Sequence, residues 1–173
     1  RLTKVTGVQT CALPILILAD GSERPALKAL AETAPADVRR RIHWLGRKPY
    51  DELVDYYRAA DLYLSSSITD GSSVSLLEAM GCGLPVLVSD IPGNLEWVDD
   101  GKSGFLFPTG DSDAMAERML FLSRRRTTLR PIGASARLRI ESEADWSRNI
   151  RKITDAYASA IRHAAGLSEG NAG

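Results

Sequence analysis

The chain has 173 residues, of which 44% are hydrophobic and 25% are charged, and its 22 Lys and Arg residues balance its 22 Asp and Glu residues. This length suits one globular domain, and the balanced charge gives no electrostatic reason to expect nucleic acid or an anionic membrane as a partner. The longest apolar run is far shorter than the roughly 20 residues of a membrane-spanning helix. Cys11 and Cys82 lack the spacing of metal ligands, so we expect no metal site. We expect a cytoplasmic protein that can also contact a membrane peripherally.

The first fifteen residues are predicted to be foreign to the domain. The chain begins with Arg1, and residues 5–15 read as the in-frame translation of a common sequencing adapter. We therefore expect residues 1–15 to be an artefact, residues 16–165 to form the domain, and residues 166–173 to be a disordered tail. The alternative for the first segment is a genuine N-terminal strand.

Short apolar runs alternate with helical periodicities along the rest of the chain. The runs predict strands, and the periodicities between them predict helices; Trp146 is expected to anchor the last helix to the domain. This alternation indicates an α/β domain with a Rossmann-like parallel sheet flanked by helices, in which ligands bind beyond the carboxyl ends of the strands. The expected strands are 15–19, 42–45, 62–64, 85–88 and 104–107, and the main helices begin near residues 24, 50, 74, 111, 127 and 145.

The loop at residues 65–73 carries the densest chemical signal, because it joins a predicted strand to a predicted helix. Gly71 lets the backbone come close to a ligand. The N–H groups of Ser72, Ser73 and Val74 are the unsatisfied donors of a helix start, and with the helix dipole they suit an anion such as a diphosphate.

Two carboxylates flank this predicted anion site, Asp70 before the helix and Glu78 within it. A charge on a helix as apolar as this one is costly unless it is paired or hydrogen-bonded. Ligand hydroxyl groups would satisfy Glu78. The alternative is an exposed Glu that shares a polar face with Ser75, and the residues alone leave both interpretations open.

Residues 65–90 resemble the signature of the retaining glycosyltransferases of family 4, which have the two-domain GT-B fold. The family places an acidic residue and a Glu, with seven residues between them, around a glycine-rich helix start, and Asp70 and Glu78 have this separation. The run Glu78-Ala-Met-Gly-Cys-Gly-Leu-Pro-Val86 also matches the family pattern. The likeness extends over about residues 15–160.

The resemblance implies a role for each of these positions. Glu78 would bind the ribose hydroxyls of the donor nucleotide, and Asp70 stands at the catalytic position, where a Glu usually contacts the donor sugar. The usual aromatic-glycine pair after the loop glycine is here replaced by two serines. The backbone N–H groups that would bind the sugar and diphosphate belong to Gly71, Ser72, Ser73 and Val74. The turn that would lie beside the base is formed by Gly46, Arg47 and Lys48.

The resemblance further implies transfer of a sugar with retention, without metal or other cofactor, from a UDP- or GDP-type donor to a carbohydrate or lipid-linked acceptor. Such transfer would serve polysaccharide, lipopolysaccharide or other glycoconjugate synthesis. In the family, the C-terminal domain begins with a strand that is followed by an Arg and a Lys, and a separate N-terminal domain binds the acceptor. The sequence contains no counterpart of any of these features. We therefore expect this chain to be inactive alone, with its sheet interrupted, or filled by residues 2–8, where that strand belongs.

Other functions have weaker support. A dinucleotide-binding oxidoreductase needs a G-x-G-x-x-G turn, whereas the first turn here is Ala19-Asp-Gly-Ser22. A sugar-nucleotide epimerase and a non-catalytic nucleotide-sugar-binding homologue stay as alternatives. Asn94 and Glu96 follow the strand at 85–88 and so face the ligand side, and their contact with donor or acceptor is left open.

Overall fold

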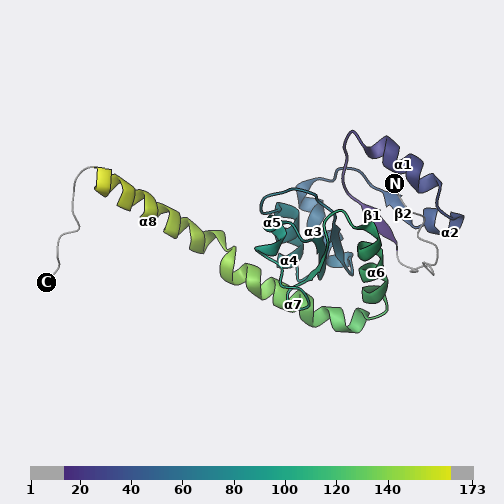
Figure 1. The fold of residues 1–173 in the computed structure, drawn as a ribbon. Coiled ribbons are helices and arrows are strands. Elements are labelled where there is room, and N and C mark those ends of the chain that lie inside the picture. The colour runs from purple at the N-terminus through teal and green to yellow at the C-terminus, as the bar shows by residue number, and fades with distance from the viewer. Residues whose placement is uncertain (1–13, 165–173) are drawn as a thin grey trace.

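The computed structural model describes residues 14–164, so the predicted tail and nearly all of the predicted adapter segment lie outside the described residues. Strands and helices alternate along it, with a long helical segment at the end (Figure 1). The strands are β1 (Ile15–Ile17), β2 (Ile42–Trp44), β3 (Tyr63–Ser65), β4 (Val86–Ser89) and β5 (Phe105–Phe107). The helices are α1 (Arg24–Glu32), α2 (Ala36–Arg39), α3 (Tyr50–Ala59), α4 (Val74–Gly81), α5 (Pro92–Leu95), α6 (Ser112–Ser123), α7 (Arg126–Glu143) and α8 (Trp146–Ala164).

The predicted α/β class is confirmed, and every predicted strand and helix is present. The strands are parallel wherever they pair. The short helix α2 was not among the predicted elements. Pro35 has an extended backbone with ψ of 145° and serves as the N-cap residue of α2, which carries Asp37 in its first turn.

The strands form two sheets, with the orders β1-β2 and β3-β4-β5. Among residues 14–164 no pairing joins β1 to β3. Residues 2–8, the predicted alternative filling of this place in the sheet, lie outside the described residues. A cavity of about 920 Å³ lies between these two strands and is lined by both of them. Side chains of α3 and α6, among them Tyr56 and Met119, also line it.

The core is built around β4, which is buried along its whole length. Val86 and Val88 face α4, where Leu76 and Met80 are fully buried in the same cluster. Leu87 faces the other side and packs in a second cluster with side chains of β5, α6 and α7. A parallel strand covered on both faces is expected to be apolar throughout, and burial on the α4 side holds that helix firmly against the sheet.

The last helix, α8, extends away from the domain as a continuation of α7 (Figure 1). The prediction that Trp146 anchors it is wrong, because 68% of that residue is exposed and α8 contributes no buried residue among those described. Ile153, Tyr157 and Ile161 are exposed on the same helix. No helix within residues 14–164 is long and apolar enough to cross a bilayer.

Truncation of Met80 to Ala should destabilise the domain by about 2–5 kcal/mol, because it removes a fully buried side chain next to β4 and leaves a cavity. Urea denaturation measures this loss. The matched control is Leu138→Ala, at a residue that is 66% exposed on α7, which should change stability by less than about 0.5 kcal/mol. Equal effects of the two substitutions would contradict the assignment of the core to the contact between α4 and β4.

Candidate functional site

The N-terminus of α4 has no side-chain cap. Ser73 is the N-cap residue, but its hydroxyl makes no capping bond and lies 3.2 Å from the hydroxyl of Ser75, which in turn is 2.8 Å from that of Tyr63. The first turn of α4 contains no acidic residue. The first N–H groups of α4 therefore donate no hydrogen bond to the side chain of its N-cap residue, which suits an anionic ligand.

Glu78 is half-buried on α4 and lines the cavity between β1 and β3. The hydroxyl of Tyr57, from α3, donates a hydrogen bond of 3.0 Å to its Oε2 atom. Burial, and next this hydrogen bond to Glu78, raise the pKa of Tyr57. Glu78 is therefore neither an ordinary exposed residue nor fully satisfied, because a carboxylate can accept about four hydrogen bonds and Tyr57 supplies one.

At the carboxyl end of β3, the cavity is lined by Ser65, Ser66 and Ser67 together with Glu78, and Asp61, Ser123 and Arg126 also line it. Most of its remaining lining is apolar. Asp70 is exposed and is not among the lining residues, so the cavity does not bring the two predicted carboxylates together. The catalytic role of Asp70 stays a prediction.

The turn after β2 contains the residues predicted to lie beside the base. Gly46 has a positive φ of 71°, and the guanidinium of Arg24 packs close to it. The ammonium group of Lys48 lies 5.8 Å from the centre of the Tyr56 ring. Neither Gly46, Arg47 nor Lys48 lines the cavity, and their contact with a base stays a prediction.

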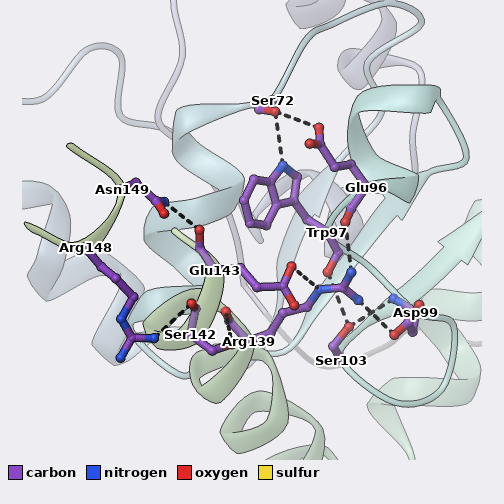
Figure 2. Close-up of polar contacts among 10 residues, drawn as sticks. All are labelled: Ser72, Glu96, Trp97, Asp99, Ser103, Arg139, Ser142, Glu143, Arg148 and Asn149. Atoms are coloured by element: carbon purple, nitrogen blue, oxygen red, sulfur yellow. Dashed lines mark hydrogen bonds and ion pairs between the residues drawn. The ribbon is translucent and has the colours of Figure 1, made fainter. Parts of the chain in front are cut away.

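The segment after β4 contains Asn94, whose contact with donor or acceptor the sequence left open. This side chain is buried, and its Nδ2 donates to the backbone carbonyl oxygen of Ser89 at 2.8 Å, so it holds the turn into α5 and does not face a ligand. Glu96 accepts a hydrogen bond of 3.0 Å from the hydroxyl of Ser72, and the indole N–H of Trp97 donates to the same hydroxyl at 3.1 Å (Figure 2).

Neither this three-residue contact nor the bond between Tyr57 and Glu78 is visible in the sequence. The partners lie 21 to 25 positions apart on different elements, and local patterns carry no signal for such pairs. The sequence shows only that each of these positions holds a side chain able to form a hydrogen bond. Within the described part of the chain, no group of three or more His, Cys, Asp or Glu side chains could hold a metal ion.

Comparison with known proteins identifies relatives for most of the chain. Residues 3–125 match the family model described as glycosyl transferases group 1. Amylovoran biosynthesis glycosyltransferase AmsK from Erwinia amylovora is 36% identical over 137 residues, which are 75% of this chain and 34% of that protein. The family match begins inside the segment predicted to be foreign, and the origin of that segment stays a prediction.

Two solved structures share the fold. Sucrose-phosphate synthase from Thermosynechococcus elongatus has a TM-score of 0.78 at 23% identity and covers 88% of this chain, which corresponds to 39% of the synthase chain. Anabaena HepE in complex with UDP has a TM-score of 0.74 at 22% identity, over 85% of this chain and 41% of its own. These likenesses confirm the predicted Rossmann-like part of a GT-B fold.

The chain spans about a third of the length of AmsK and about two fifths of the two solved structures. The family model is described as one of glycosyl transferases, and AmsK is likewise named a glycosyltransferase. Because the family model matches well over half of its residues, the chain belongs to the glycosyl transferases group 1 family.

Proposed function

We propose that this chain is the donor-binding part of a retaining glycosyltransferase of family 4. In the whole polypeptide, a sugar would pass from a UDP- or GDP-type donor to a carbohydrate or lipid-linked acceptor. The observation that carries the proposal is the uncapped N-terminus of α4, followed one turn later by the half-buried carboxylate of Glu78.

The diphosphate of the donor is assigned to the start of α4. The backbone N–H groups of Ser72, Ser73 and Val74 would donate to its oxygens, and the helix dipole would favour its negative charge. The same interactions grow stronger as charge develops on the leaving diphosphate, which is electrostatic stabilisation without a metal ion. The helix cannot shift away, because its buried side holds it against β4.

The ribose of the donor is assigned to Glu78. The bond from Tyr57 to Oε2 fixes the carboxylate, and Oε1 is left to accept from ribose hydroxyl groups. Hydrogen bonds to an ionised acceptor are about twice as strong as neutral ones, so this contact would contribute much of the nucleotide affinity. Asp70 would contact the sugar from the loop, and the turn at Gly46, Arg47 and Lys48 would lie beside the base.

The relatives support this assignment in kind. AmsK is named as a glycosyltransferase of amylovoran biosynthesis, and one solved structure of HepE holds UDP while another holds UDP-glucose. Both proteins are much longer than this chain, so acceptor binding is proposed to reside in a domain outside it. We propose that the chain alone is inactive and that the whole protein is cytoplasmic, with peripheral contact to a membrane.

The activity is tested by assaying the whole polypeptide for release of UDP or GDP from a set of nucleotide sugars with carbohydrate and lipid-linked acceptors. Nuclear magnetic resonance of the product reports the anomeric configuration. We expect transfer with retention. An inverted product, an epimerised sugar without transfer, or binding without release would contradict the proposal, and the last two outcomes would favour an epimerase or a non-catalytic homologue.

Substitution of Glu78 by Gln should weaken the binding of UDP or GDP to this chain. The loss of a charge-assisted contact is worth about 1.5–3 kcal/mol, which corresponds to a roughly ten- to hundredfold rise in Kd. Isothermal titration calorimetry measures the affinity, and circular dichroism checks the fold. The control is Glu117→Gln, at an exposed carboxylate on α6. An unchanged affinity in Glu78→Gln would remove Glu78 from the site.

Substitution of Tyr57 by Phe tests the buried contact between Tyr57 and Glu78. Burial, and next the hydrogen bond to Glu78, raise the folded pKa of Tyr57, so the neutral phenol favours the fold fully below the unfolded pKa of about 10 and less as the pH rises further. We expect Tyr57→Phe to be less stable than the wild type at pH 8, with a difference that shrinks above about pH 10. A difference in the free energy of unfolding that is constant across this range would contradict the raised pKa of Tyr57 and so its burial beside Glu78.

A further inference from the structure

The loop that precedes α4 rests directly on the backbone of α5. A Cβ atom built on Gly93 would lie 2.1 Å from the carbonyl oxygen of Gly71 and 2.9 Å from that of Asp70. These distances are far below van der Waals contact, so only a glycine at position 93 lets the loop lie where it does. The path of the loop is therefore set in part by a residue 22 positions further along the chain.

The side chain of Ser72 ties the same loop to the end of α5. Its hydroxyl donates to Oε2 of Glu96 at 3.0 Å and accepts from the indole N–H of Trp97 at 3.1 Å (Figure 2). A serine hydroxyl has a single proton to donate, so these two partners define its orientation. Asp70, Gly71 and Ser72 are otherwise exposed, and a glycine-containing loop has high conformational freedom when it is untethered.

The segment that supports the loop is itself anchored to the core. Asn94 and Val98 are buried, and Asn94 is bonded to the backbone of Ser89 at the end of β4. From α7, Arg139 donates to the carbonyl oxygen of Glu96 at 3.0 Å and to Oδ2 of Asp99 at 2.8 Å (Figure 2). The loop is therefore supported by a turn that two other elements hold in place.

We infer that Gly93, Glu96 and Trp97 are positioning residues, which order the loop of residues 70–73 so that its amides point at one anion. They touch no donor atom themselves. Ordering the loop in advance lowers the entropy lost when a ligand binds. This positioning role rests on the proposed function, because the anion is the donor diphosphate. The ordering of the loop can nevertheless be measured without any ligand.

The first experiment measures backbone ¹⁵N order parameters of residues 71–73 in the free chain. Ser72→Ala removes both hydrogen bonds and keeps the backbone N–H group, and Trp97→Phe removes one donor and keeps a ring. In each variant we expect order parameters to fall from about 0.85 toward about 0.6 or below. Trp146→Phe, at an exposed residue of α8, is the control for the loss of an indole and should change none of them.

The second experiment measures Kd for UDP and for GDP by calorimetry in the same variants. Loss of a hydrogen bond that orders the loop should raise Kd roughly three- to tenfold, with little change in Tm. Gly93→Ala should raise it at least as much, because the new methyl group would displace the loop. Its control is Gly21→Ala, where a built Cβ meets nothing within 4 Å.

The two readouts separate this inference from the proposed function. Order parameters that stay unchanged in both Ser72→Ala and Trp97→Phe would overturn the inference, whether or not nucleotide binds. A loss of order with unchanged Kd would overturn the positioning role and leave the helix start as the binding site. Failure of the wild-type chain to bind UDP or GDP would count against the proposed function and so against a donor-positioning role. The order parameters would still decide whether the contacts of Ser72 with Glu96 and Trp97 order the loop.

Discussion

The rest of the site depends on the burial of α4 against β4. Because Leu76, Ala79 and Met80 are buried without exposed surface, this short helix has one position and one direction, and its N-terminus always faces the loop after β3. Packing energy from the core thereby fixes the direction of the unsatisfied N–H groups and of the helix dipole. Ser73 makes no capping bond and the first turn of α4 holds no acidic residue, so the first N–H groups stay available for the anion that we propose to bind there.

The half-buried carboxylate of Glu78 opens onto the cavity that β1 and β3 line. Ile15 and Leu16 of β1 are 38% and 40% exposed, although parallel strands are normally covered on both faces. They border the same cavity into which Glu78 and Tyr57 reach. Glu78 is thus held by α3 on one side and opens onto the space between β1 and β3 on the other, so its environment is half-buried and half-open. The carboxyl group of Glu78 therefore lies one turn after the start of α4 without being fully buried.

Local patterns were enough to predict the order and type of the elements. The apolar runs at β1 to β5 and the turn residues that bound them, such as Gly46 and Gly81, gave strand and helix positions within about two residues, because these signals act over a few positions. The helix start at Ser73 was also readable, since its donors follow from chain geometry alone. Trp146 was misread because the exposure of α8 depends on what packs against it, which periodicity does not reveal.

The contacts that support the site could not be predicted in the same way. The bond from Tyr57 to Glu78 and the tether from Trp97 to Ser72 join elements whose separation is set by the packing of α3, α4 and α5 against the sheet. The need for glycine at position 93 is also a tertiary effect, because it arises from the carbonyl groups of another loop. Sequence patterns therefore predicted where an anion would bind, whereas the structure shows which contacts support that loop and helix.

The central claim is that the amides at the start of α4 receive a diphosphate. The most direct measurement is a titration of the ¹⁵N-labelled chain with UDP and with GDP, followed by amide chemical shifts. We expect at least one nucleotide to cause its largest shifts at Ser72, Ser73 and Val74. Shifts concentrated elsewhere, for instance at the turn after β1, with these three amides unmoved, would contradict it.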